Sequence, residues 1–398
     1  MSDVYQQSVE YHRQHKGKLG VQSLVSVKNR DDLSLAYTPG VAEACRVIAK
    51  DPTESFELTM RGRTVAVVSD GSAVLGLGNI GAAAAMPVME GKSLLMREFA
   101  GVDSIPLVID TQETSQIIEF VKQVAPSFAG INLEDIAAPR CFEVEDALQE
   151  IGIPVFHDDQ HGTAIVVTAA LHNAAKVVGK NFADLKVVMV GAGAAGLATA
   201  KMLLGLDGPW TALSQLSDIE RVAQLKLVDT RGVVYPSRPD VTTHHNRFKA
   251  ALLPFSNTPD EAGDLAAALV GADVLIGVSG PNLVTAEMVK SMAPGAIVFA
   301  MANPTPEILP DLAHQAGAVV VATGRSDFAN QVNNVLAFPG VFRAVIKARL
   351  PRITTQMKYA AAHALAQMVP DPTATSILPD PFQPELAEKV ADAIIAAQ

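Results

Sequence analysis

The chain has 398 residues, of which 49% are hydrophobic and 18% charged, a composition typical of a globular protein with large buried cores. Its formal net charge of −11 argues against binding to nucleic acid or to an anionic membrane, because no stripe of lysine and arginine is present to collect phosphates. No apolar stretch approaches the ~18 residues that a membrane span requires, so no membrane partner is expected.

The cysteine content indicates the compartment. Only Cys45 and Cys141 occur, without a CxxC motif or a disulfide pattern, and this usage fits a reducing environment. Residues 1–20 are polar and lack the apolar core of a secretory signal. We therefore expect a cytoplasmic protein.

Apolar strand-like runs alternate with alanine-rich stretches along the chain, a pattern that predicts an α/β fold with parallel sheets and crossover helices. In chain order the predicted strands are Thr64–Ser69, Ile105–Ile109, Val155–Phe156, Lys186–Val190, Leu225–Val228, Val274–Val278, Ile297–Ala300 and Val319–Ala322. The predicted helices include Ile117–Ala125, Thr163–Val178, Ala194–Leu204, Glu261–Leu269 and Phe342–Ala348.

This alternation divides the chain into three parts. Residues 1–160 are expected to form a first α/β domain, and residues 161–338 a second domain that opens with the strand at Lys186–Val190. Residues 339–398 read as helices interrupted by a proline-rich loop.

Two side chains in the first domain could carry protons. Tyr37 lies in the sequence Tyr-Thr-Pro-Gly, and Lys92 follows Glu90-Gly91 at what the pattern suggests is the beginning of a helix. Taken singly, the first is a common turn and the second a solvated lysine. Burial or a nearby cation could lower the pKa of the lysine toward ~7–8, the range useful to a general base.

A glycine-rich segment, Gly76-Leu-Gly78-Asn-Ile-Gly81, matches the dinucleotide fingerprint Gly-x-Gly-x-x-Gly. Residues 70–75 separate it from the strand at Thr64–Ser69, so the strand does not lead directly into the glycines. We interpret this segment as a loop on the substrate side.

Four carboxylates follow two apolar runs. Glu134 and Asp135 form one acidic pair, and Asp158 and Asp159 form another after the strand at Val155–Phe156. Each pair alone could be a solvated helix start. Two such pairs at strand ends repel one another unless a divalent cation neutralises them, and oxygen ligands suit Mg²⁺ or Mn²⁺ better than zinc.

Histidines beside the second acidic pair do not change this conclusion. His157 and His161 are four residues apart but lack the glutamate between them that a zinc protease motif requires.

The second domain contains a strand that leads directly into a glycine loop and then into a helix, as a dinucleotide site requires. Its first glycine permits a tight turn, the second lets the backbone approach a pyrophosphate, and the helix N-terminus attracts the phosphate charge. The loop residues expected to bind the cofactor are Gly191, Ala192, Gly193, Ala194, Ala195 and Gly196.

An acid at the end of the next strand usually holds the adenosine ribose, about 20 residues beyond the glycines. Asp229 is the candidate, but it lies 33 residues beyond Gly196, and an insertion at 205–219 would explain the excess. Asp229 would favour NAD by repelling a 2′-phosphate, whereas Arg231 could receive that phosphate. The choice stays open and leans to NAD.

Asparagines follow two later segments. Asn303 comes after the strand at Ile297–Ala300, and Asn333 and Asn334 lie farther along. Neutral amides can bind a carboxylate without adding charge beside a metal, although loop asparagines are commonly turn formers.

Taken together, seven motifs resemble the malic enzymes, specifically the short bacterial form. The resemblance implies oxidative decarboxylation of (S)-malate to pyruvate and CO₂, with NAD or NADP and with Mn²⁺ or Mg²⁺. The motifs span Tyr37–Ala42, Asp70–Gly81, Glu90–Lys92, Asn132–Ile136, Phe156–Ala164, Ala302–Glu307 and Asn333–Gly340.

The resemblance also implies roles for these residues. Glu134, Asp135 and Asp159 would ligate the metal, and Asp158 would orient a catalytic group. Lys92 would take the C2 hydroxyl proton, and Tyr37 would protonate C3 of enolpyruvate. The substrate carboxylate would be held by Asn303 and by Asn333, Asn334 or both.

By the same resemblance, residues 1–160 form the substrate and metal domain, and residues 161–338 form a Rossmann-type, doubly wound NAD(P)-binding domain. Larger malic enzymes have a substrate-binding arginine where Ala73 aligns, so that charge must come from elsewhere. The 205–219 insertion is expected beside the adenosine end of the cofactor. A homodimer is expected, and Tyr37 could reach a neighbouring subunit.

Two alternatives remain open. The same site could convert malate to lactate with bound NAD, or the chain could be a catalytically silent dinucleotide sensor.

Overall fold

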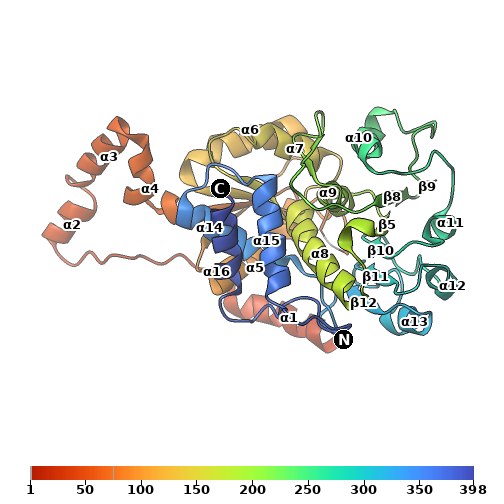
Figure 1. Cartoon of the computed structure of the whole chain (residues 1–398). Helices are drawn as coiled ribbons and strands as arrows, with labels where there is room; N and C mark the ends of the chain where they lie inside the picture. Colours follow the sequence, from red (N-terminus) through yellow and green to blue (C-terminus); the bar gives the residue numbers. More distant parts are fainter. Residues whose placement is uncertain (1, 75) are drawn as a thin grey trace.

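A computed structural model describes residues 2–74 and 76–398 and has two separate parallel sheets (Figure 1). The first sheet has the strand order β2-β1-β3-β4, with all pairs parallel. The bounds are β1 (Thr64–Ser69), β2 (Asp103–Val108), β3 (Gly130–Leu133) and β4 (Val155–His157). This confirms the predicted α/β fold class.

The second sheet has the order β12-β11-β10-β5-β8-β9, and only the short edge strand β9 runs antiparallel to its neighbour. The order reverses at β5, which pairs with both β8 and β10, so this is a doubly wound sheet with its switch point there. The bounds are β5 (Lys186–Val190), β8 (Gln224–Asp229), β9 (Gly232–Val233), β10 (Val274–Gly277), β11 (Ile297–Ala300) and β12 (Val320–Thr323).

Two long helices, α5 (Ala82–Ala100) and α8 (Asp158–Val177), pack beside the two sheets. Helix α5 packs on β1 and β2, and α8 packs against α9 (Ala194–Leu203). Most side chains of α8 are buried, because the helix is apolar nearly all round and lies inside the protein. One apolar core therefore runs from the first sheet through α8 to the second sheet.

The C-terminal helices pack back on the body of the molecule (Figure 1). Helix α14 (Phe338–Ala348) lies against α5, and α15 (Thr355–Gln367) lies against α8. The side chain of Asn173 on α8 donates to the carbonyls of Ala366 and Ile377, at 2.9 and 3.0 Å. The remaining helices and strands are α1 (Ser2–His15), α6 (Thr114–Val124), α7 (Arg140–Leu148), β6 (Leu206–Asp207), β7 (Ser214–Gln215), α10 (Arg247–Leu252), α11 (Leu265–Leu269), α12 (Ala286–Lys290), α13 (Pro310–Gln315) and α16 (Leu386–Ala396).

An arm extends from the body near the N-terminal end of the chain (Figure 1, left). It consists of α2 (Arg30–Ala36), α3 (Val41–Lys50) and α4 (Ser55–Leu58), and none of the side chains of α2 and α3 is buried. Several of its apolar side chains are open to solvent, with Leu35 80% exposed.

Two elements of the first domain need correction. The sequence placed a strand end before Glu134 but gave no bounds for that strand, β3, which is only four residues long and begins with glycine. Helix α5 was missed because Pro87 and Gly91 interrupt its pattern. Lys92 lies within this helix rather than at the beginning of one.

Among the described residues, no helix combines the length and apolar composition that a membrane span needs.

The insertion at 205–219 also lies elsewhere than predicted. It contains the β6–β7 hairpin, and its Trp210 packs against the rings of Phe142 and Phe248, which also contact each other. Large aromatic side chains bury substantial apolar area, and this cluster holds the insertion against α7 and α10.

Candidate active site

The predicted acidic residues meet at the carboxyl edge of the first sheet. Glu134 and Asp135 follow β3, while Asp158 and Asp159 begin α8 directly after β4. Because β3 and β4 are adjacent and parallel, their ends deliver both pairs to one place. Oxygen atoms of Glu134, Asp135 and Asp159 all lie within 4.8 Å of one another.

A left-handed turn aims one of these acids. Asp135 has φ of 54°, a conformation uncommon for a residue other than glycine, and its backbone N–H donates to Asp159 Oδ2 at 2.8 Å. Its Oδ2 atom is buried and has no hydrogen-bond partner within the part of the chain that the structure describes. Strain and an unpartnered carboxylate oxygen at one residue are typical of a binding site rather than of packing.

Lys92 reaches the same place from within α5. Its Nζ lies 2.6 Å from Asp158 Oδ2 and 2.9 Å from Glu134 Oε1, and it sits over the ring of Phe338. Asn334 also donates to Asp158 Oδ2, at 2.5 Å. The structure therefore brings together Lys92, both acidic pairs and Asn334.

The four carboxylates of this cluster carry more negative charge than the one buried cation paired with them, Lys92, can neutralise. Burial first, and then repulsion from Asp159 and Glu134, raises the pKa of Asp135 to about 9. Burial likewise raises the pKa of Asp158 to about 7 and that of Asp159 to about 6. Burial alone would lower the pKa of Lys92, but Asp158 and Glu134 reverse this and raise it above its usual value. The excess negative charge and all-oxygen donors suit a hard divalent cation.

Of the two nearby histidines, only His161 is engaged away from the acids: it binds the carboxylate of Glu145, with Nε2 2.8 Å from Oε1. His157 is fully buried, and its Nδ1 lies 3.7 Å from Asp159 Oδ2. Across residues 2–74 and 76–398, the cluster of Glu134, Asp135 and Asp159 is the single group of three or more such side chains within metal-binding distance. This agrees with the interpretation that the site is not a zinc-protease motif.

A cavity of about 590 Å³ opens beside the acids. Gly76 and Gly78 line it, as do residues of the glycine loop after β5, and the substrate-side role of the first glycine segment stays a prediction. Among its described lining residues there is no lysine, arginine or histidine. The predicted residues Asn303, Asn333 and Asn334 line it together with Ala73, Asp135 and Asp159.

Glu307 supports this cavity and was not identified as a functional candidate. Its buried carboxylate accepts the backbone N–H groups of Ser279 at 2.9 Å and Ala302 at 3.0 Å. These two groups lie just beyond the ends of β10 and β11, so Glu307 holds both loops at the cavity. Glu307 lies in a proline-rich loop outside any helix or strand, where hydrophobic periodicity could not indicate this role.

The glycine loop after β5 lies between this cavity and a larger one of about 1240 Å³, since Gly193 lines both. Gly191 has φ of +111°, and a Cβ atom added at Gly196 would lie 1.9 Å from the Gly191 carbonyl oxygen. No atom of residues 2–74 or 76–398 lies within 4 Å of a Cβ added at Gly193. The loop therefore keeps open space at its second glycine, as a bound pyrophosphate requires.

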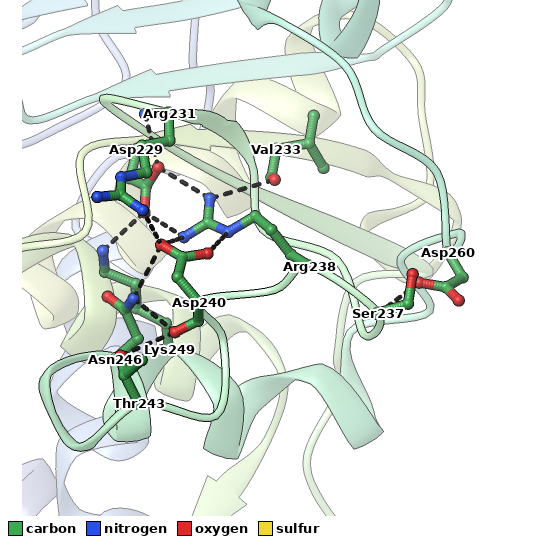
Figure 2. Close-up of polar contacts among 10 residues, drawn as sticks. All are labelled: Asp229, Arg231, Val233, Ser237, Arg238, Asp240, Thr243, Asn246, Lys249 and Asp260. Carbon is green, nitrogen blue, oxygen red and sulfur yellow. Dashed lines mark hydrogen bonds and ion pairs between the residues drawn. The ribbon is translucent and has the colours of Figure 1, made fainter.

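Asp229 lies at the end of β8 and lines the larger cavity, where the sequence placed it (Figure 2). The sequence missed two cations that hold its carboxylate, Arg238 and Lys249. Of the described lining residues, none comes from the 205–219 insertion, which was expected here.

Tyr37 is not at the acidic cluster of its own chain. It ends helix α2 on the arm and is 66% exposed. Its predicted role therefore requires another subunit.

Comparison with known proteins identifies relatives for the whole fold. A family model described as malic enzyme, NAD binding domain, matches residues 160–397, and one described as malic enzyme, N-terminal domain, matches residues 15–118. The chain is 48% identical over 395 residues to a bifunctional malic/malolactic enzyme of Bacillus subtilis, covering 98% of this chain and 92% of that protein.

Other relatives differ in the cofactor that their names give. An NADP-dependent malic enzyme of Halomonas elongata is 43% identical over 417 residues, with 100% of this chain and 94% of that protein covered. A crystal structure of an NAD-dependent malic enzyme from Thermotoga maritima has 44% identity and a TM-score of 0.90, and the match covers 97% of this chain and 98% of that chain.

Proposed function

Because the chain belongs to the malic enzyme family, we propose that it converts (S)-malate to pyruvate and CO₂ while reducing NAD or NADP. One observation above all supports this proposal. Lys92 is held by Asp158 and Glu134 beside the acidic cluster, and the adjoining cavity is lined both by Asp135 and Asp159 of this cluster and by the dinucleotide loop. A proton acceptor, oxygen ligands and a hydride acceptor would thus converge on one small substrate.

We propose that Glu134, Asp135 and Asp159 hold Mn²⁺ or Mg²⁺. The unpartnered Asp135 oxygen and the raised pKa values of these acids support a site that needs positive charge. When bound, the cation would act as a Lewis acid toward the C2 oxygen of the substrate.

The protein's own groups would then handle the protons. Without a cation the acids hold Lys92 in its protonated form. Lys92, whose neutral form would be favoured by an adjacent divalent cation, would take the C2 hydroxyl proton as hydride leaves C2, with Asp158 and Asn334 fixing the position of its amine. Asn303 and Asn333, which line the same cavity, would hold a substrate carboxylate, since the described lining has no cationic side chain.

We propose a homodimer in which Tyr37 of one subunit completes the site of the other and protonates C3. Its exposure on the arm, and the exposed apolar side chains around it, support this arrangement. The division into residues 1–160, 161–338 and 339–398 and a cytoplasmic location are proposed on the sequence evidence alone.

The test is absorbance of reduced nicotinamide with malate, Mn²⁺ and either nucleotide, followed by assays of pyruvate and lactate. Pyruvate equal to the reduced nucleotide is expected. Lactate without reduced nucleotide would favour malolactic chemistry, the second activity in the name of the Bacillus subtilis relative. Nucleotide binding without any turnover would instead indicate a sensor.

A further inference from the structure

The carboxylate of Asp229 has no free acceptor position for a ribose (Figure 2). Its Oδ1 accepts from the Arg231 backbone N–H and from Arg238 Nη1, both at 2.9 Å. Its Oδ2 accepts from Arg238 Nη2 at 2.8 Å and from Lys249 Nζ at 2.7 Å. A carboxylate offers about four lone-pair positions, and all four are occupied here.

The charge of Asp229 is also neutralised. Burial would raise its pKa, but the hydrogen bonds from Arg238 and Lys249 outweigh burial and hold the pKa below its usual value. Arg238, only 6% exposed in its side chain, also pairs with Asp240, Nε to Oδ1 at 2.7 Å. Arg231 pairs with Asp240 as well. Three cations and two acids make this cluster net positive.

Two of the cations face the cavity in which the adenosine would lie. Lys249 and Arg231 line it, and the Arg231 side chain is 71% exposed. An ammonium group has three donors, so Lys249 keeps two for a ligand after its bond to Asp229. Asp264 also lines this cavity and caps α11, with its Oδ1 accepting from the Ala267 N–H at 2.8 Å, so its charge lies in the same lining as these two cations.

We propose that this chain prefers NADP to NAD and that Lys249 and Arg231 bind the 2′-phosphate of the adenosine ribose. This rests on the proposed dinucleotide-dependent function. A dianionic phosphate beside Lys249 and Arg231 forms charge-assisted hydrogen bonds, whereas the ribose hydroxyls of NAD would have to displace Arg238 or Lys249 from Asp229. Asp229, at the position of the acid that usually selects NAD, is thus paired with Arg238 and Lys249 of its own chain.

Calorimetric titration of the full-length protein with adenosine 2′,5′-bisphosphate and with AMP tests the proposal, since these two differ only in the 2′-phosphate. The bisphosphate is expected to bind at least about tenfold more tightly, with an advantage that shrinks as salt is added. Equal affinities, or tighter binding of AMP, would overturn the proposal.

Lys249→Gln and Arg231→Gln should each lower the affinity for the bisphosphate about tenfold while changing that for AMP less than about twofold. Arg231 is exposed, so its variant tests the site without disturbing the buried cluster. Lys290→Gln, an exposed lysine on α12 outside the cavity lining, is the matched control and should change neither affinity. Equal losses for AMP and bisphosphate would contradict the assignment.

Malate turnover with each nucleotide tests the NADP preference separately from the proposed malic enzyme function. Higher kcat/KM with NADP is expected. Turnover that prefers NAD would overturn this inference and leave the malic enzyme function standing. Selective bisphosphate binding without malate turnover would do the reverse.

Discussion

Lys92 is the residue whose replacement should affect both stability and activity. Its ammonium lies 2.6 Å from Asp158 and 2.9 Å from Glu134, and its side chain is 9% exposed. Breaking a buried pair by removing one partner costs about 3–5 kcal/mol, because the remaining charge is uncompensated. Lys92→Met keeps similar bulk and should therefore destabilise the metal-free protein by about that amount at pH 8. Loss of the general base should lower kcat by about 10²–10⁴-fold.

Urea unfolding with EDTA, and again with Mn²⁺, measures the first effect. Bound cation should restore much of the lost stability, since a ligand at 100 times its Kd adds about 2.7 kcal/mol and replaces the missing charge. Lys180→Met is the matched control: its Nζ lies 2.6 Å from Asp273, far along the chain from the acids. It should lose about 1 kcal/mol or less, without rescue by Mn²⁺. A Lys92→Met protein as stable as the parent, or one that Mn²⁺ does not rescue, would refute the reasoning.

Three further predictions concern other parts of the protein. Gly193→Ala should weaken dinucleotide binding at least about tenfold but leave the melting temperature unchanged, because its Cβ meets no atom of the described residues within 4 Å. Gly196→Ala should lower both the melting temperature and the dinucleotide affinity, since its Cβ would lie 1.9 Å from the Gly191 carbonyl oxygen. Intact binding by Gly193→Ala in a titration would count against the loop. Burial, with His363 and Lys176, lowers the pKa of His172 to about 3, so its contribution to stability is complete above pH ~6.5 and declines as the pH falls toward 3. His172→Phe should therefore gain about 3 kcal/mol relative to the parent between pH 7 and 4.5 in urea unfolding, and parallel pH profiles would contradict this. Mixing Tyr37→Phe with Lys92→Met subunits should restore about a quarter of the parental activity if Tyr37 acts across a dimer, and none if it acts within its own chain.

The second domain was predictable because its signals are local. The predicted strands of this domain, β5, β8, β10, β11 and β12, are rich in apolar residues, and Gly191–Gly196 follows β5 without a gap. The first domain was harder to predict from the sequence. Pro87 and Gly91 conceal helix α5, and burial of Lys92 depends on the sheet that α5 covers.

The site shows the same division. Glu134, Asp135, Asp158 and Asp159 follow strand ends, so adjacency of parallel strands was enough to bring them together. The partners of Asp229 could not be found in this way. Arg238 and Lys249 are nine and twenty residues beyond it, in irregular chain and in α10, and only the folded path returns them to the end of β8.

The most direct test of the proposed chemistry is the product balance from (S)-malate labelled with heavy carbon at C4. We predict that all of the label leaves as CO₂, with one pyruvate and one reduced nicotinamide formed per malate, and that EDTA abolishes turnover until Mn²⁺ or Mg²⁺ is restored. Reduced nucleotide with the label retained in oxaloacetate, or lactate without reduced nucleotide, would contradict the account.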